Sequence, residues 1–400
     1  MTDSSLKKMW IGGQAVDGDA GVAPLVSVNP ATGEVNYEVA AAGAKAADTA
    51  VRVADEAARD KKWRNMLPPA RAAILSRIAD GMERRSEELA RLQMIENGKV
   101  WRECQTQVKS AAATFRYYAA VCETTGSEVT PARGDYLSMS VYEPYGVVAA
   151  ITPWNSPMTM EAQKVAPALA AGNAVILKPS EITPSTGLLL AEIAQEAGLP
   201  PGILNVLPGT GQQVGAALVE HPRVRMVSFT GGTESGRRIA ETAARKLMPV
   251  ALELGGKSPH IVFNDAPVDS AVAALAGGIF EGSGQSCVAG SRAFVQRGVY
   301  DEVVAKLSAV ARSLKVDLPD AAGAEMGPLA TFAHRDKVAA MVEAARAAGA
   351  DILAGGARPG SQALERGAYY LPTLIGGIDN HAAIAQQEIF GPVLCMIPFD

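Results

Sequence analysis

The chain has 400 residues, of which 48% are hydrophobic and 20% are charged, and its formal net charge is −5 at pH 7. This balance is ordinary for a globular protein of two or three domains, and it excludes intrinsic disorder as the general state. The acidic balance also disfavours nucleic acid or an anionic membrane as the main partner. No stretch is long and apolar enough to span a bilayer.

Four cysteines and four histidines are scattered along the chain without the spacings that bind zinc, so no metal site is expected. The cysteines form no CxxC pair, and such scattered thiols are typical of a reducing cytoplasm. They are Cys104, Cys122, Cys287 and Cys395. The first residues lack the apolar segment of a signal peptide, so we expect a cytoplasmic protein.

Residues 1–40 read as short strands and turns, and amphipathic helices are expected after them. Apolar residues at helical spacing predict helices at about 45–60, 69–83, 87–96 and 103–122. The pattern then changes, and residues 124–143 are expected to form two strands joined by a turn that contains Gly134. An exposed hairpin edge of this kind is a candidate for pairing with another subunit.

Residues 146–254 hold the most regular pattern in the chain. Strand-like apolar runs alternate with helical runs, and they lie at 146–152, 174–178, 203–207, 226–230 and 249–254. Alternation at this spacing predicts a parallel, doubly wound sheet that binds its ligands at the carboxyl ends of the strands. Asn155, Lys178 and Gly231–Gly232 follow or end three of these runs.

A second α/β unit is expected to start after Gly255–Gly256 and to continue through the strand-like run 369–375. Within it, a Gly-rich turn, Gly282-Ser283-Gly284-Gln285-Ser286-Cys287, ends in a cysteine. Glycines on both sides of Ser283 permit φ values that other residues avoid, so a side chain can be presented in a crowded place. Cysteine is a strong nucleophile as a thiolate, but a lone cysteine in an apolar chain is more often a small buried hydrophobe.

Three further features could carry chemistry, and each has a plain structural alternative. Gly231–Gly232 precede a helix whose N-terminus suits a phosphate, although such helix starts often serve packing only. Glu253 ends an apolar strand, where a carboxylate acts as a base or forms a structural ion pair. Asn155 donates its amide to an oxyanion or caps the next helix. Because nothing near Cys287 suggests a histidine partner, a cysteine hydrolase is disfavoured and oxidation of a covalent adduct is favoured.

The chain resembles the NAD(P)-dependent aldehyde dehydrogenase superfamily over essentially its whole length. The matching stretches occur in the family's order: Pro153–Pro157, Lys178–Glu181, Gly198–Gly202, Phe229–Gly236, Leu252–Pro259, Gly284–Cys287 and Glu388–Pro392. The resemblance implies an α/β fold of two doubly wound domains, one Rossmann-like and one catalytic, plus a bridging and oligomerisation β-hairpin. The implied ranges are 1–123 and 144–253 for the NAD-binding domain, 124–143 for the hairpin and 254–400 for the catalytic domain.

The resemblance also implies oxidation of an aldehyde to the carboxylic acid. Cys287 would attack the aldehyde, Asn155 would hold the oxyanion, and Glu253 would activate the water that hydrolyses the thioester. The residues implied to bind the cofactor are Trp154, Lys178, Glu181, Gly231, Gly232, Glu388 and Phe390. The carboxylate of Glu181 should repel a 2′-phosphate, so NAD is favoured over NADP.

Two departures from the family affect these expectations. Members that act on small apolar aldehydes often carry aromatic residues where this chain has Ser156 and Gln163. We expect these two residues, with Met160, to line the substrate pocket and to favour a polar aldehyde such as a semialdehyde or hydroxyaldehyde. Family chains also continue past the Glu388 motif, so the catalytic domain is expected to be incomplete, and a homodimer or homotetramer is expected of the complete protein.

Two alternative functions stay open at this point. One is a CoA-acylating semialdehyde dehydrogenase, which the presence of Glu253 disfavours because those enzymes often lack the general base. The other is an inactive, truncated dinucleotide-binding homologue, which intact Cys287, Glu253 and Asn155 disfavour.

Overall fold

A computed structural model describes residues 6–400, and these residues fold as two compact units. Unit 1 consists of residues 6–27, Tyr37–Leu92 and Gln105–Glu253. Unit 2 consists of Val28–Asn36, Gln93–Cys104 and Leu254–Asp400. Each unit has a sheet of its own.

Unit 1 is built on a sheet whose strand order, within the described residues, is β2-β1-β7-β6-β5-β8-β9. Its parallel strands are β5 (Val147–Ile151), β6 (Ala174–Lys178), β7 (Leu204–Val206), β8 (Val224–Thr230) and β9 (Val250–Glu253). β1 (Met9–Ile11) pairs antiparallel with β7 and with β2 (Gln14–Val16). Every residue of β5 and β6 is buried, which explains why residues 147–151 and 174–177 read as continuous apolar runs, with Lys178 at the end of β6 as the charged exception. The predicted parallel sheet is confirmed.

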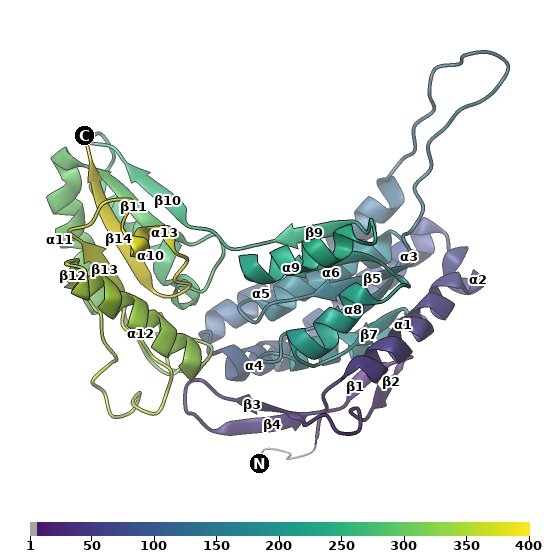
Figure 1. Cartoon of the computed structure of the whole chain (residues 1–400), viewed down its shortest axis with the longest axis horizontal. Helices are drawn as coiled ribbons and strands as arrows, with labels where there is room; N and C mark the ends of the chain where they lie inside the picture. Colours follow the sequence, from purple (N-terminus) through teal and green to yellow (C-terminus); the bar gives the residue numbers. More distant parts are fainter. Residues whose placement is uncertain (1–5) are drawn as a thin grey trace. The chain divides into compact units, whose positions relative to one another are not determined.

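Helices cover both faces of this sheet (Figure 1). α1 (Ala44–Arg59) and α8 (Ala216–Glu220) pack on one face, and α9 (Thr233–Ala244) packs beside α8. α6 (Pro157–Ala170) and α7 (Ser185–Glu196) pack on the other face, where α3 (Pro68–Arg84) contacts both. The remaining helices are α2 (Lys61–Arg64), α4 (Ser86–Asn97) and α5 (Trp101–Thr124), and a π-helical turn, η1 (Gly211–Gly215), leads into α8.

The predicted hairpin at residues 124–143 is paired, but it does not form two strands. A single bridge joins Val129 to Met139, and the backbone N–H of Thr130 donates to the carbonyl of Ser138 at 3.0 Å. Gly134 has a φ of 112°, as the turn requires. The prediction of regular strands was wrong because an isolated two-stranded ribbon has no neighbouring strand or packed face to extend its pairing.

Unit 2 contains a sheet with the strand order β10-β11-β14-β13-β12 among the described residues. β10 (Ser258–Val262), β11 (Gly290–Gln296), β14 (Val393–Phe399) and β13 (Thr373–Gly376) are parallel, and β12 (Asp351–Ala354) is antiparallel to β13. A separate two-stranded sheet pairs β3 (Leu25–Val28) with β4 (Val35–Val39).

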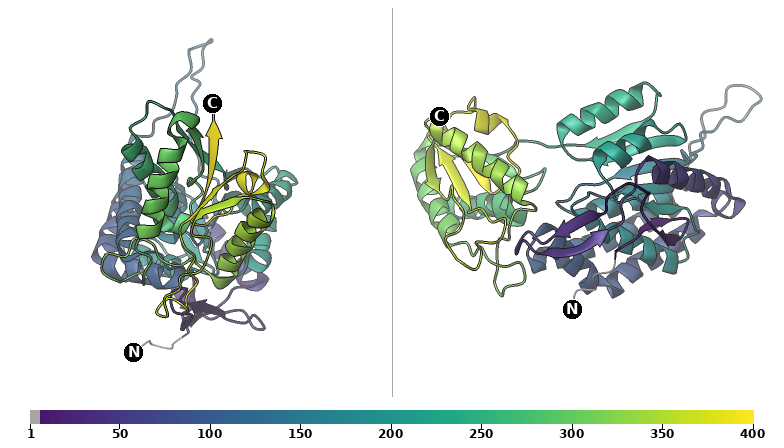
Figure 2. Two further views of the ribbon diagram at one scale, coloured as in Figure 1. Left: turned by 90° about the vertical axis from the view of Figure 1, so that its left-hand side faces the viewer. Right: turned by 60° about the horizontal axis from the view of Figure 1, so that its bottom comes forward.

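Side chains that alternate along β14 divide the core of unit 2 into two layers. Leu394 and Met396 pack with α10 (Val268–Phe280) and α11 (Arg297–Ser313). Val393 and Cys395 pack on the other face with α12 (Phe332–Ala347) and α13 (Ala383–Gln386). Figure 2 shows these helices around the sheet. The second α/β unit expected from the sequence is therefore confirmed.

The unit boundaries differ from the predicted domain boundaries in the N-terminal part. The prediction placed residues 1–123 together, whereas residues 28–36 and 93–104 belong to unit 2. The backbone N–H of Ala368, for example, donates to the carbonyl of Pro30 at 2.7 Å. Contacts between segments so far apart in the chain leave no periodic signal in the sequence. No helix within residues 6–400 has the length and apolarity needed to cross a membrane.

Candidate active site

Polar residues and glycines collect at the carboxyl ends of β5, β6 and β8 in unit 1. β6 and β7 follow β5 in one direction across the sheet, whereas β8 and β9 lie on the other side of β5. The strand order therefore reverses between β5 and β8, which is where open α/β sheets bind their ligands. Asn155 follows β5, Lys178 ends β6, and Gly231 follows β8.

Asn155 lies half-buried in the connection from β5 to α6, between Trp154 and Ser156. The N-cap of α6 is Ser156, and Pro157 occupies its first turn. The structural alternative for Asn155, a helix cap, is thereby excluded for α6. The hydroxyl of Ser156 accepts a hydrogen bond from the side-chain amide of Gln107 at 3.0 Å.

Lys178 and Glu181 form an ion pair at the end of β6, with 3.3 Å between Nζ and Oε2. The lysine side chain is 4% exposed and the glutamate side chain 46% exposed. Burial lowers the pKa of Lys178, and the carboxylate of Glu181 opposes that shift. In this pair the cation of Lys178 is buried, and the carboxylate of Glu181 is accessible to a ligand.

Gly231 and Gly232 connect β8 to α9. Gly232 is the N-cap of α9, and its lack of a side chain leaves the first turn of the helix without a side-chain cap. The backbone N–H of Gly231 donates to the carbonyl of Glu253 at 3.0 Å, which ties this loop to the end of β9. Backbone N–H groups at such a helix start bind anions, phosphate above all.

Cys287 lies in unit 2, in the loop between α10 and β11. It is a free thiol and half-buried, whereas Cys104, Cys122 and Cys395 are buried. Before it, a short turn, η2 (Glu281–Gly284), holds Gly282 and Ser283 in the left-handed region at φ values of 59° and 57°. Cys287 is therefore the most accessible of the four thiols.

Glu388 and Phe390 lie in unit 2 as well. Oε1 of Glu388 accepts a hydrogen bond from the backbone N–H of Gly256 at 3.2 Å. Phe390 has a φ of 59°, and its carbonyl oxygen is 2.6 Å from Nε2 of His334. A side chain at Gly256 would place its Cβ 3.5 Å from the carbonyl oxygen of Cys287, so the Glu388 loop and the Cys287 loop share a neighbour.

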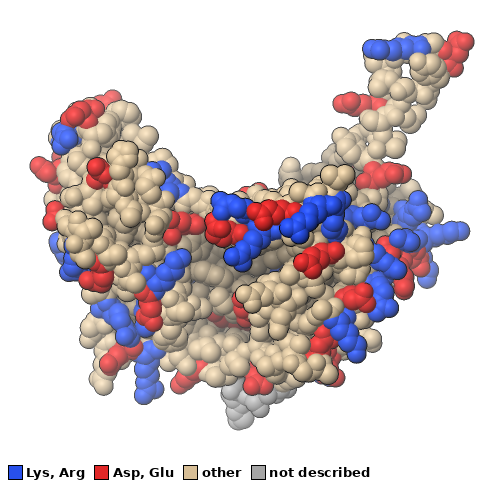
Figure 3. Space-filling model, viewed as in Figure 1, with Lys and Arg blue, Asp and Glu red and all other residues tan. Residues whose placement is uncertain are grey.

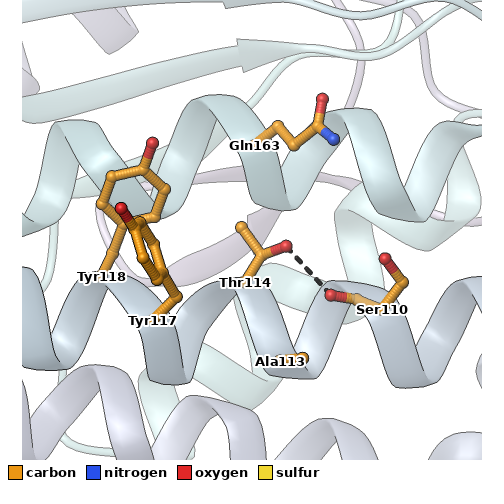
Figure 4. Close-up of a pocket in the computed structure, with 6 residues that line it drawn as sticks. All are labelled: Ser110, Ala113, Thr114, Tyr117, Tyr118 and Gln163. Atoms are coloured by element: carbon orange, nitrogen blue, oxygen red, sulfur yellow. Dashed lines mark hydrogen bonds between the residues drawn. The ribbon is translucent and has the colours of Figure 1, made fainter.

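A pocket of about 550 Å³ lies between α5 and α6 in unit 1 (Figure 4). The residues that line it are Ser110, Ala113, Thr114, Tyr117, Tyr118 and Gln163. Gln163 comes from α6 and the other lining residues from α5, where the rings of Tyr117 and Tyr118 meet edge to face with 5.1 Å between their centroids. Of the three residues expected in a substrate pocket, Gln163 lines this one, while Ser156 is the N-cap residue of α6 and Met160 lies in its first turn.

Known proteins with the same fold settle the family. The model described as "Aldehyde dehydrogenase family" matches residues 16–400. The chain belongs to the aldehyde dehydrogenase family. A 3,6-anhydro-alpha-L-galactose dehydrogenase of Streptomyces coelicolor is 42% identical over 391 residues, which are 96% of this chain and 77% of that protein.

Solved structures agree with that assignment. The NAD+ complex of an aldehyde dehydrogenase from Bacillus cereus has a TM-score of 0.96 at 37% identity, covering 99% of this chain and 80% of that one. Betaine aldehyde dehydrogenase from Staphylococcus aureus, in complex with NAD+, has a TM-score of 0.96 at 36% identity, covering 98% and 79%. This aldehyde dehydrogenase is thus an oxidoreductase, and NAD-dependent oxidation of an aldehyde is the general reaction of its family.

Lys164 is a residue of this aldehyde dehydrogenase that the sequence reasoning missed. It is 6% exposed on α6, and its Nζ donates to the hydroxyl of Ser228 at 3.0 Å. Burial lowers its pKa to about 8, and the carboxylate of Glu253 acts in the opposite direction. The sequence could have indicated this residue, because Lys164 occupies a core position of the apolar run 158–171 and buried lysines are rare.

Replacing Lys164 by methionine should stabilise the protein at pH 7, and the advantage should vanish in alkali. The unfolded chain keeps the ordinary lysine pKa of 10.5, so between pH 8 and 10.5 it binds more protons than the folded chain. The cost of the buried charge is fully present below pH 8 and is relieved as the pH rises, by about 3 kcal/mol at most.

Melting temperatures of Lys164→Met and wild type, measured from pH 7 to pH 10, check this expectation. The exposed Lys45→Met variant is the control, and its difference from wild type should stay constant. If the difference in melting temperature between Lys164→Met and wild type does not change with pH, the amine of Lys164 does not carry a buried charge.

Proposed function

We propose that this enzyme oxidises polar, uncharged aldehydes to carboxylic acids with NAD, through a thioester on Cys287. The observation that carries the proposal is the half-buried thiol of Cys287 at the end of a turn held in the left-handed conformation. Unit 1 would serve as the NAD-binding domain and unit 2 as the catalytic domain.

Cys287 acts as the nucleophile in this proposal. Its sulfur forms a bond to the aldehyde carbon, the carbonyl electron pair moves to oxygen, and a thiohemiacetal results. The side-chain amide of Asn155 and the backbone N–H of Cys287 donate hydrogen bonds to the oxyanion. NAD, when bound, supplies the acceptor for the hydride that leaves the same carbon.

Glu253 completes the reaction as the general base. Its carboxylate takes a proton from a water molecule, whose oxygen attacks the thioester carbon. The carbon–sulfur bond then breaks, the thiolate of Cys287 leaves, and the carboxylic acid is released. Glu253 is exposed at the end of β9, so water reaches it without a conformational change.

The residues present fit a dinucleotide. The uncapped start of α9 behind Gly231 and Gly232 suits the pyrophosphate, and the exposed carboxylate of Glu181 suits a ribose with free hydroxyls. Lys178 would hold Glu181 in place and bind the adenosine ribose with it. By resemblance to the family, Trp154 would also contact the cofactor, and Glu388 and Phe390 would contact its nicotinamide half.

We expect Glu181→Gln to raise the ratio of kcat/KM for NADP to that for NAD by roughly tenfold, because a carboxylate near a 2′-phosphate repels it. Steady-state rates of NADH and NADPH formation measure the ratio. Glu196→Gln on α7 removes an exposed carboxylate elsewhere and should leave the ratio unchanged. An unchanged ratio in Glu181→Gln would place the adenosine ribose away from this residue.

The pocket between α5 and α6 supports an uncharged, hydroxylated aldehyde as substrate. Its lining offers hydroxyl and amide groups, and among the described residues that line it there is no lysine or arginine to bind a carboxylate. Of the polar aldehydes that the sequence allows, a hydroxyaldehyde therefore fits this pocket better than a dicarboxylic semialdehyde.

Gln163→Leu should lower kcat/KM for glyceraldehyde relative to hexanal by about tenfold, because it removes a hydrogen-bonding group from the pocket. Wild type should prefer glyceraldehyde to both hexanal and succinic semialdehyde. Gln105→Leu, which changes an exposed glutamine of α5 outside the pocket, is the control. Preference of the wild type for hexanal would overturn the assignment of a polar substrate.

A CoA-acylating reaction is the alternative to hydrolysis, and the identity of the product separates the two. With aldehyde, NAD and CoA present, chromatography should find the free acid and no acyl-CoA. Acyl-CoA as the main product would show that CoA, and not water activated by Glu253, attacks the thioester. NADH formation with an aldehyde panel tests the remaining alternative, an inactive dinucleotide-binding protein.

We also infer a homo-oligomer that works in the cytoplasm. The hairpin at residues 124–143 exposes large apolar side chains, including Val129, Leu137 and Tyr142, that a second copy would cover. Figure 3 shows this segment mostly as uncharged surface with charges near its tip. Four free thiols suit a reducing compartment.

A further inference from the structure

The turn that precedes Cys287 is held by a carboxylate that the reaction itself does not use. Glu103 lies near the start of α5 and belongs to unit 2. Its Oε1 accepts a hydrogen bond from the backbone N–H of Gly282 at 3.0 Å. Its Oε2 lies 3.9 Å from Nζ of Lys99, and the side chains of Lys99 and Glu103 are only 9% and 17% exposed.

This turn needs external support because its backbone is strained. Gly282, Ser283 and Gly284 have consecutive φ values of 59°, 57° and 69°, all in the left-handed region. Ser283 carries a Cβ, so this conformation costs it free energy, and a run of such residues persists only where the surroundings fix it.

Each residue of the turn has a contact of its own. The hydroxyl of Ser283 donates to the carbonyl of Gly327 at 2.9 Å, and Gly284 packs directly against the backbone of Gly391. Gly282 has the contact with Glu103, and a Cβ added to it would lie 2.6 Å from Nζ of Lys99. Lys99 and Glu103 therefore enclose Gly282 from two sides.

The contact at Gly282 differs in kind from the other two. Ser283 makes a neutral hydrogen bond and Gly284 a packing contact, whereas Glu103 offers an ionised acceptor in a mostly buried place. Hydrogen bonds to ionised groups are about twice as strong as neutral ones. The nearby ammonium of Lys99 also lowers the cost of keeping the carboxylate out of water.

We propose that Glu103, supported by Lys99, is a positioning residue for the nucleophile. It fixes the backbone turn and so determines where the thiol and the backbone N–H of Cys287 lie. The inference rests on the proposed function, in which both groups of Cys287 act on the aldehyde. Because small displacements of reacting groups cost up to roughly 100-fold in rate, the effect should appear in kcat.

Four variants of the whole 400-residue chain test this role: Glu103→Ala, Glu103→Asp, Glu103→Gln and the control Glu281→Gln. Glu281 is an exposed neighbour of Gly282, so its change removes the same charge beside the turn without touching the contact with α5. Two quantities are measured: kcat and KM with NAD and aldehyde, and the rate of Cys287 alkylation by iodoacetamide from pH 6 to pH 10. Alkylation of each variant in a Cys287→Ala background corrects for the other thiols.

Glu103→Ala should lower kcat by about 10- to 100-fold and change the alkylation profile, with KM for NAD within about twofold of wild type. Glu103→Gln still offers an oxygen to Gly282 but lacks the charge, so its kcat should lie between those of Glu103→Ala and wild type. Glu281→Gln should keep the kcat of wild type. Glu103→Asp is one methylene too short to keep the contact unchanged and should be slow even if Glu103→Ala fails to fold.

Wild-type kcat and alkylation in folded Glu103→Asp or Glu103→Ala would overturn the inference. It would also fail if Glu103→Gln were as slow as Glu103→Ala, because then the hydrogen bond to Gly282 would not be the cause. Full activity of Cys287→Ala would instead contradict the proposed function itself, so the two failures are distinguishable.

Discussion

Replacement of Cys287 by alanine is expected to lower kcat for aldehyde oxidation by about 10⁴-fold or more, since it removes the sulfur that forms the covalent intermediate in the proposed reaction. Affinity for NAD should stay within about twofold of wild type, because the residues proposed to hold most of the dinucleotide belong to unit 1. NADH absorbance measures turnover, and quenching of tryptophan fluorescence measures NAD binding.

Cys122→Ala is the matched control for this result. Cys122 is a buried thiol of α5 whose Sγ lies 3.4 Å from the carbonyl oxygens of both Pro68 and Ala170, either of which can accept its one hydrogen. Its replacement should cost some stability and leave kcat near that of wild type. Residual activity of Cys287→Ala above about 1% of wild type would assign the nucleophile to another residue.

Glu253→Gln is expected to stop the reaction after its first half. Attack by Cys287 and oxidation do not need the carboxylate, whereas hydrolysis of the thioester does. Steady-state turnover should therefore fall by roughly 10²- to 10⁴-fold, which is the usual contribution of a general base. A stopped-flow trace should still show a burst of one NADH per active thiol, followed by a slow phase.

Glu241→Gln removes an exposed carboxylate from α9 and is the control for the loss of one negative charge in unit 1. Its time course of NADH formation should match that of wild type. Loss of the burst in Glu253→Gln, with NAD still bound, would mean that Glu253 acts before oxidation, for example on the thiol of Cys287.

The two sheets were predictable from the sequence for a simple physical reason. A strand covered on both faces by helices is apolar along most of its length, and β5 is apolar throughout while β6 is apolar up to its last residue, Lys178. Because parallel strands place their carboxyl ends at one edge, the neighbourhood of Asn155, Lys178 and Gly231 followed from the alternation alone. The turn before Cys287 was also predictable, because Gly282 and Gly284 favour a backbone with positive φ.

Other features depend on contacts between segments far apart in the chain. Glu103 reads as one more charge on a helix, and only the fold brings its carboxylate to the N–H of Gly282. Lys164 acquires its altered pKa from burial and from Glu253, neither of which its sequence neighbours reveal. Regular strands were expected around Gly134 from local pattern, and they are absent there because the segment packs against no third strand within the described residues.

The most direct test of the central claim is the intact mass of Glu253→Gln after mixing with NAD and the preferred aldehyde. Arrest before hydrolysis predicts that the protein gains the mass of the acyl group, that peptide mapping places it on Cys287, and that hydroxylamine removes it. An unmodified protein at a time when the burst of NADH is complete would contradict a thioester on Cys287. An acyl group found on any other residue would contradict it equally.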